Sequence, residues 1–120
     1  MMDDYAYLFS LAKRVSSSAP MTDATVSATA TNASCGDECT VHLKVTNGII
    51  EAVSVEATGC VISRASAGVL ADAIIGPIGQ ISRMGGNDVR NLLGIPVSPL
   101  RERCLTTALN ALQIAITKIK

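Results

Sequence analysis

The sequence predicts an α+β domain in which a small antiparallel sheet of three strands packs against helices, with a long helix at the C-terminus. Two alternating apolar and polar runs, 39–45 and 49–57, flank an Asn-Gly pair, which is typical of a β-hairpin. A third alternating run lies earlier in the chain, over 25–31. A broad apolar stripe at helical spacing from Leu100 to Ile119 indicates the long helix.

The other helices are predicted from local signals. Residues 3–15 have apolar side chains at helical spacing. Ser63 is expected to cap a helix through Ile74, because Gly-Pro follows as a stop signal. A short helix over 87–93 is expected to end at a glycine, and the C-terminal helix is expected to start at Ser98-Pro99.

Length and charge limit the classes of function. A chain of 120 residues is expected to form a single domain, 1–120. The 10 basic and 10 acidic side chains cancel, and the only aromatic residues are Tyr5, Tyr7 and Phe9. Nucleic-acid binding normally needs a basic surface, and single strands also need aromatic stacking platforms. We therefore expect no nucleic-acid partner.

The ends of the sequence and its cysteines indicate the compartment. The N-terminus carries Asp3 and Asp4, whereas a secretory signal would be basic, and no apolar run approaches the roughly 18 residues of a membrane span. We expect a cytoplasmic protein without a membrane partner. In that reducing compartment its four cysteines are expected to be thiols or metal ligands rather than disulfides.

The hairpin brings two cysteines together by turn geometry. A two-residue turn would pair Cys39 with Glu56, whereas a three-residue loop with a bulge at Gly48 pairs apolar with apolar residues, and we prefer it. Either arrangement carries Cys35 and Cys60 to the same open end of the hairpin. The preferred register pairs 45 with 49, 41 with 53 and 39 with 55.

Three cysteines and one aspartate form the candidate site. Cys35 and Asp37 make a Cys-x-Asp pair, Cys60 precedes a predicted helix, and Cys104 lies early in the C-terminal helix beside arginines that favour a thiolate. Thiolates are the soft ligands of zinc and of iron–sulfur clusters. These residues therefore predict one metal or cluster site.

Two other residues of metal-binding type are assigned different roles. Cys39 belongs to the inward face of its strand and is expected to pack in the core. His42, the only histidine, lies on the outward face, roughly 23 Å along an extended strand from Cys35. We expect it to be a surface residue outside the site.

Three motifs give the chain a family resemblance over residues 32 to 116. They are Asn-x-x-Cys-Gly-Asp from Asn32, Gly-Cys-x-Ile-Ser-x-Ala-Ser from Gly59, and Pro-x-Arg-x-x-Cys from Pro99. In this order they resemble the U-type iron–sulfur cluster scaffolds, which comprise IscU, SufU and the N-terminal domain of NifU. The resemblance implies a three-stranded antiparallel sheet packed against helices.

The resemblance also implies a function and a ligand set. A scaffold of this kind receives sulfur from a cysteine desulfurase, builds a [2Fe–2S] cluster and transfers it to recipient apoproteins, as a carrier rather than an enzyme. By matching position, its ligands are Cys35, Asp37, Cys60 and Cys104. Cys104 and Cys35 are the candidate sulfur acceptors, and Asp37 is the ligand expected to exchange during transfer.

Departures from the family leave alternatives open. Arg103 occupies the position of a histidine in IscU-like members, which resembles SufU, yet the 43 residues between Cys60 and Cys104 lack the SufU insertion. A zinc-dependent sulfur acceptor of the SufU type, which would be a sulfurtransferase, is one alternative, and a structural zinc protein is another. Residues 1–24 diverge from the family. The segment 97–101 resembles the IscU site for an Hsp70-type chaperone only in chemical kind, so that partnership is not carried over.

Overall fold

The structure is a computed structural model of the chain. It describes residues 6, 10, 13, 21–32, 36–94, 97 and 102–119. Most of the predicted N-terminal helix, Cys35 and the predicted start of the C-terminal helix therefore lie outside the described residues. The elements are β1 (Val26–Asn32), β2 (Asp37–Thr46), β3 (Ile49–Thr58), α2 (Val61–Ala73), β4 (Gly76–Pro77), α3 (Gly79–Ser82), α4 (Gly86–Leu93) and α5 (Glu102–Thr117).

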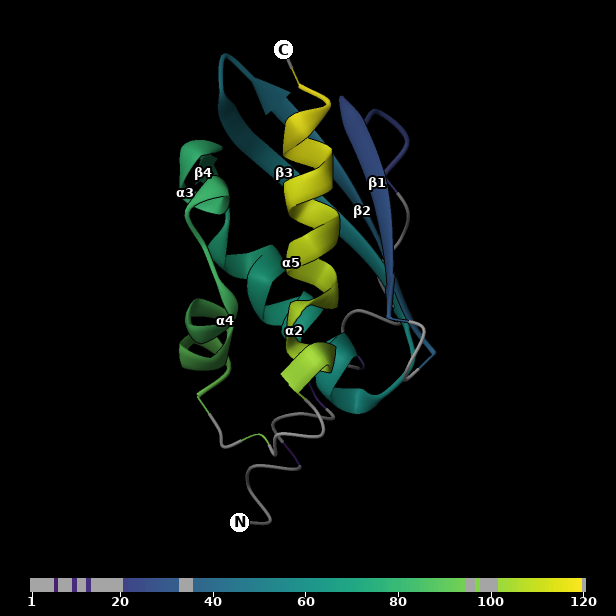
Figure 1. Ribbon diagram of the computed structural model, residues 1–120. Helices are drawn as coiled ribbons and strands as arrows, with labels where there is room; N and C mark the ends of the chain where they lie inside the picture. Colours follow the sequence, from purple (N-terminus) through teal and green to yellow (C-terminus); the bar gives the residue numbers. More distant parts are fainter. Residues whose placement is uncertain are drawn as a thin grey trace.

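The described elements form two layers, as the sequence predicted. Three long antiparallel strands and the two-residue β4 make one sheet in the order β1-β2-β3-β4. Helix α5 runs lengthwise over β1 and β2, with α2 beside it on the same face (Figure 1). The α+β fold is confirmed. The sequence analysis did not predict β4, which pairs its two residues with Ile49 and Ile50.

The predicted hairpin register is wrong. Asn47 and Gly48 form a two-residue turn with φ of 52° and 76°, and Thr46 pairs with Ile49. Left-handed backbone at both positions is typical of the turn that matches strand twist. A bulge then shifts the ladder by one residue at Glu51, so that Cys39 pairs with neither predicted partner but with Ala57. Because of the bulge, apolar residues still pair with apolar residues, for example Val41 with Val55. The sequence analysis had explained such pairing by a three-residue loop.

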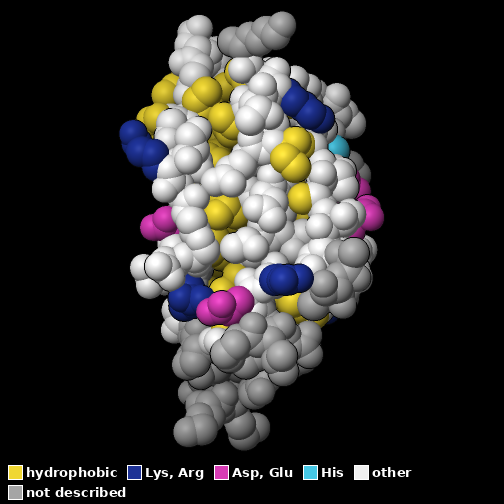
Figure 2. All heavy atoms as spheres, in the orientation of Figure 1, with side chains coloured by type: hydrophobic (Ala, Val, Ile, Leu, Met, Phe, Trp, Pro, Cys, Tyr) yellow, Lys and Arg dark blue, Asp and Glu magenta, His cyan; other side chains and the backbone are white. Residues whose placement is uncertain are grey.

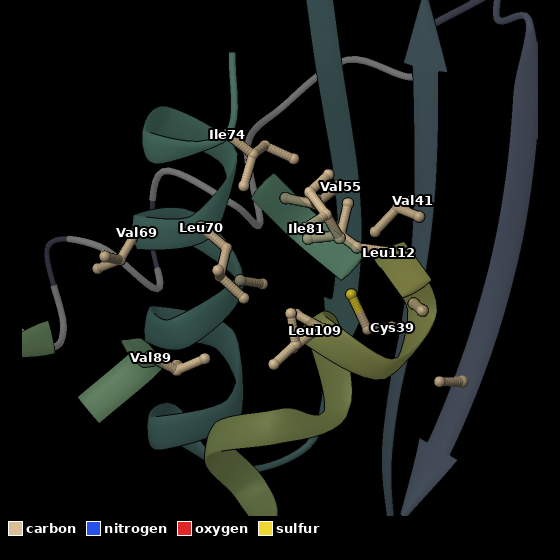
Figure 3. Close-up of a cluster of buried hydrophobic side chains, with 14 of the residues drawn as sticks. Cys39, Val41, Val55, Val69, Leu70, Ile74, Ile81, Val89, Leu109 and Leu112 are labelled. Carbon is tan, nitrogen blue, oxygen red and sulfur yellow. The ribbon is translucent and has the colours of Figure 1, made fainter. Parts of the chain in front are cut away.

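The core lies between the sheet and the helices. Alternation along β1, β2 and β3 directs Ala28, Val41, Leu43 and Val55 inward, where they pack against leucines and alanines of α2 and α5. Cys39 belongs to this layer, and its sulfur lies among core side chains near Leu109 and Leu112 (Figure 3). The prediction that Cys39 packs in the core is confirmed, since it is fully buried.

The helix boundaries differ slightly from prediction. Helix α2 starts earlier than expected, because its N-cap is Cys60 and not Ser63. The prediction that Cys60 precedes a helix is confirmed, and Cys60 lies nearer to the helix than predicted. Helix α4 ends at Gly94, which has a left-handed φ of 75° as the sequence indicated. The short helix α3 was not predicted.

The face of the sheet away from the helices is polar. On it, His42 hydrogen-bonds through Nδ1 to Ser27 Oγ at 2.7 Å and through Nε2 to Glu56 Oε2 at 2.7 Å. His42 thus links three strands instead of being a freely solvated side chain. It takes no part in the group of potential metal ligands that the described residues contain.

The helix-bearing face carries no single extended apolar area in view. Figure 2 shows hydrophobic side chains surfacing in separate patches between charged side chains and white areas of backbone and other side chains. The large apolar side chains exposed among the described residues are Ile49, Ile75, Leu92 and Ile114. Among the described helices, no segment is long and apolar enough to cross a membrane.

Candidate metal or cluster site

Three predicted site residues from different parts of the chain meet at one end of the molecule. Asp37 begins β2, Cys60 follows β3, and Cys104 lies in the first described turn of α5. The first described turn of α5 and the start of α2 lie toward the lower end of the molecule in Figure 1. Their ligand atoms lie within 4.8 Å of one another. Cys35, the fourth predicted ligand, is outside the described residues, two positions before Asp37 in sequence.

Asp37 is a buried carboxylate held by two hydrogen bonds. It is 1% exposed, and its Oδ1 accepts from the backbone N–H of Cys60 at 2.9 Å. Its Oδ2 accepts a longer bond, 3.5 Å, from the side-chain amide of Asn32. Among the described residues no cationic side chain pairs with it. A buried carboxylate normally has a cation or a metal as partner, so this environment fits metal ligation.

Gly59 allows the close approach of Asp37 to the Cys60 backbone. Its φ is +113°, a conformation that other residues rarely adopt. A Cβ at this position would lie 2.1 Å from Asp37 Oδ1, far inside van der Waals contact. The glycine of the Gly-Cys motif is therefore required by both backbone conformation and space.

Cys60 is held at the start of α2. Its backbone is extended, with φ of −72° and ψ of 161°, and its Sγ accepts a hydrogen bond from Ser63 N at 3.4 Å. Free N–H groups and the helix dipole favour negative charge at a helix N-terminus. Cys104 lies in the first described turn of α5.

Burial separates the described members of the site. Cys104 is fully buried and Asp37 nearly so, whereas Cys60 is partly exposed. Cys60 is thus the described sulfur through which solvent or a partner reaches the site. The predicted acceptor Cys104 would have to be reached past it or by a local movement.

The donor set fits a soft metal or an iron–sulfur cluster. Two thiol sulfurs and one carboxylate oxygen are suitable ligands for zinc and for iron. A tetrahedral zinc ion, about 2.3 Å from each sulfur, would hold two sulfurs about 3.8 Å apart. A separation of at most 4.8 Å is therefore closed by a movement of about 1 Å.

Some contributors to the site were missed by the sequence analysis. Asn32 and Gly59 belong to quoted motifs, but their roles toward Asp37 became evident only from the fold. Ser63 was interpreted as the helix cap, whereas its N–H donates a hydrogen bond to the Cys60 sulfur. Its hydroxyl is buried and has no hydrogen-bond partner among the described residues. The signal available in the sequence was that Ser63, a polar residue of the Gly-Cys motif, follows Cys60 by three positions.

Comparisons with known proteins agree on one family. The family model described as NifU-like N terminal domain matches residues 14–120. The chain is 34% identical over 114 residues to the iron-sulfur cluster assembly scaffold protein IscU of Thermotoga maritima, covering 81% of this chain and 80% of that protein.

Solved structures share the fold. One is FiSufU of Fervidobacterium islandicum AW-1, named as a candidate iron-sulfur cluster assembly scaffold for the SUF system, with a TM-score of 0.73, 24% identity, and coverage of 92% of this chain and 93% of that one. Another is the N-terminal part of a nitrogen-fixing NifU-like protein from Brucella abortus, with a TM-score of 0.76, 19% identity, and coverage of 98% and 96%. At these identities the likeness concerns the fold.

Proposed function

Since the chain belongs to the NifU-like N-terminal domain family of iron–sulfur cluster assembly scaffolds, we propose that it assembles a [2Fe–2S] cluster and transfers it to recipient apoproteins. The sulfur comes from a cysteine desulfurase. The observation that carries the proposal is the convergence of Asp37, Cys60 and Cys104, with ligand atoms within 4.8 Å of one another. Cys35 is proposed as the fourth ligand.

A mixed donor set suits a carrier. Three thiolates hold the cluster, while the Asp37 carboxylate is a harder ligand that iron exchanges more readily than a thiolate. The hydrogen bonds divide its two oxygens. Oδ1 is committed to the Cys60 N–H at 2.9 Å, and Oδ2 is held only at 3.5 Å, so we assign Oδ2 as the metal ligand.

Sulfur receipt requires an accessible thiolate. The acceptor thiolate attacks the outer sulfur of the desulfurase persulfide, a new S–S bond forms on the acceptor, and the desulfurase thiolate leaves. Cys35 and Cys104 are the acceptors that the family resemblance suggests. The partial exposure of Cys60 adds it as a third candidate, because Cys104 is fully buried.

The spacing of the ligands also supports a second function. Donors this close suit a single tetrahedral ion, as in a zinc-dependent sulfur acceptor that stimulates a desulfurase without building a cluster. A purely structural zinc site would use the same donors. The scaffold differs from the other two functions in its bound metal, and the two zinc functions differ in their effect on the desulfurase.

Anaerobic purification and metal analysis, followed by incubation with a cysteine desulfurase, cysteine and ferrous iron, separates these functions. We expect a coloured, labile cluster with iron and acid-labile sulfide in equal amounts. We also expect it to transfer to an apo-ferredoxin. Replacing Cys60 by Ala should prevent assembly, whereas replacing the core residue Cys39 by Ala should not.

The contrary results are specific. Persistent stoichiometric zinc with faster desulfurase turnover and no cluster would replace the scaffold function by the sulfur-acceptor function. Zinc without any effect on the desulfurase would leave a structural site. Neither metal nor cluster in the wild-type protein would refute all three.

A further inference from the structure

The hydroxyl of Ser63 is a buried polar group for which the described residues provide no hydrogen-bond partner. Ser63 is 1% exposed, and its Oγ has no hydrogen bond within the part of the chain that the structure describes. Buried hydroxyls in folded proteins are nearly always satisfied, because a lost bond to water is costly. An unsatisfied hydroxyl next to a ligand group points to a partner that arrives with the bound metal or cluster.

The local geometry explains why this hydroxyl is left over. Ser63 is the third residue of α2, where a polar side chain commonly bonds back to the N–H of the N-cap residue. That N–H belongs to Cys60 and already donates to Asp37 Oδ1 at 2.9 Å. Asp37 thus occupies the hydrogen bond that Ser63 would otherwise accept.

The hydroxyl belongs to the residue whose backbone contacts the Cys60 sulfur. The N–H of Ser63 donates to Cys60 Sγ at 3.4 Å, and Oγ is carried by the Cβ attached to the same Cα as this nitrogen. A change of χ1 between staggered wells moves Oγ by a few ångströms. We propose that Ser63 donates its hydroxyl hydrogen to the anionic Cys60 sulfur once that sulfur binds metal, so that Ser63 is a positioning residue that stabilises the loaded site.

The inference rests on the proposed function and gives the Cys60 sulfur a second hydrogen bond beside the one from the Ser63 N–H. A charged acceptor gains more from such a bond than a neutral thiol, which gives the hydroxyl a reason to change partner when the site is loaded. Hydrogen bonds to ligand sulfurs also tune the properties of metal–thiolate sites. Ser63 would therefore set how firmly the site retains its metal.

Ser66 provides a matched control. It lies one turn further along α2 and is fully buried, but its Oγ donates to Ile62 O at 2.8 Å. Removing this hydroxyl breaks a bond that exists without metal. Removing the Ser63 hydroxyl breaks no hydrogen bond that the described residues show. We therefore expect Ser66→Ala to affect the stability of the metal-free protein and Ser63→Ala to affect metal binding.

The test compares Ser63→Ala and Ser66→Ala in the full chain, using zinc as the probe. In metal-free protein, Ser63→Ala should leave the thermal midpoint unchanged or raised, and Ser66→Ala should not raise it. By chelator competition, zinc affinity should fall about tenfold or more in Ser63→Ala, the size expected for a hydrogen bond to a charged group. It should change less than about twofold in Ser66→Ala. With cobalt(II), the sulfur-to-metal absorption band should shift only in Ser63→Ala.

Three results would overturn the inference. Metal-free Ser63→Ala that is clearly less stable than wild type would show a partner inside the protein. Equal zinc affinity in Ser63→Ala and wild type, or an unshifted cobalt band, would show that the hydroxyl does not reach the sulfur. Failure of the proposed scaffold function has a different signature, because the wild-type protein itself would then form no cluster when incubated with a desulfurase, cysteine and ferrous iron, whether or not it binds zinc.

Discussion

Asp37 has one observed and one proposed task, and they fall on different oxygens of its carboxylate. Oδ1 accepts the Cys60 N–H and so fixes the start of α2 relative to β2. Oδ2 is the oxygen proposed to bind the metal. Sequence reasoning identified only the second task, because the first depends on a backbone approach between residues 23 positions apart.

Replacing Asp37 by Asn or by Ala separates the two tasks. Asn keeps an acceptor for the Cys60 N–H, whereas Ala leaves that N–H unsatisfied and should lower the free energy of unfolding by about 1–3 kcal/mol. Both variants should bind zinc at least about tenfold more weakly. A cluster assembled on either should transfer more slowly, because the exchangeable ligand is gone. Denaturant unfolding gives the free energy of unfolding, chelator competition gives the zinc affinity, and the transfer half-time gives the rate of cluster transfer.

This prediction has clear contrary outcomes. Zinc affinity of the Asp37→Asn protein equal to that of wild type would remove Asp37 from the ligand set. Equal destabilisation by Asn and Ala would show that the hydrogen bond to Cys60 contributes little. Faster cluster transfer would contradict the role in exchange.

Cys39 shows how burial makes a thiol inert. Burial raises the pKa of this thiol from 9.0 to about 12. Below pH 9 the thiol is protonated in the folded and the unfolded chain alike. Between pH 9 and 12 only the unfolded chain loses the proton, so the free energy of unfolding falls as the pH rises, by up to about 1.4 kcal/mol per unit.

Cys39→Ala should remove this pH dependence. Denaturant unfolding of the variant and of wild type at about pH 8 and pH 10 should show a stability difference that changes by about 1.4 kcal/mol between the two conditions. Other titrating groups cancel in the comparison. Parallel pH profiles for the two proteins would refute the assigned pKa.

At the scale of elements, the junction between β3 and α2 determines the site. Gly59 follows the strand, and Cys60 caps the helix. The positive φ of Gly59 turns the chain, and its missing Cβ leaves room for the Asp37 carboxylate. Gly59 thus joins the hairpin to helix α2 and leaves room for Asp37, the proposed metal ligand.

Gly59→Ala should therefore affect stability and metal binding together. Left-handed strain costs about 1–3 kcal/mol, and the added Cβ would also displace Asp37 Oδ1. Gly48→Ala is the matched control, since Gly48 also has positive φ, +76°, but nothing lies within 4 Å of its Cβ position. Unfolding free energies and zinc affinities of both variants should show that only Gly59→Ala weakens binding. Equal zinc affinity in the two variants would contradict the steric argument.

The elements also show how far sequence reasoning extends. Alternation and helical spacing predicted the three long strands, α2, α4 and α5, because each buries one face against the core. The hairpin register was predicted incorrectly, since a bulge at Glu51 combines a two-residue turn with apolar pairing. The short elements β4 and α3 bury too few residues to leave a periodic signal.

At the scale of the molecule, the site joins three distant segments of the chain. Soft-ligand chemistry and motif order predicted that Asp37, Cys60 and Cys104 would meet. They did not predict the hydrogen bonds of Asn32 and Ser63 or the space left by Gly59, which depend on backbone positions set by the fold. Metal at about 100 times its dissociation constant should stabilise the folded chain by about 2.7 kcal/mol. Loading of the proposed site would thus couple the start of β2, the start of α2 and the first described turn of α5.

The most direct test of the central claim is the iron and acid-labile sulfide retained per chain after anaerobic reconstitution of single-cysteine variants. The account predicts that Cys35→Ala, Cys60→Ala and Cys104→Ala each lose the bound cluster, while Cys39→Ala, which alters only the core, keeps it. Circular dichroism spectra of the variants provide the control that each one is folded. Loss of the cluster from a folded Cys39→Ala protein, or its retention by Cys60→Ala and Cys104→Ala, would contradict the proposed site.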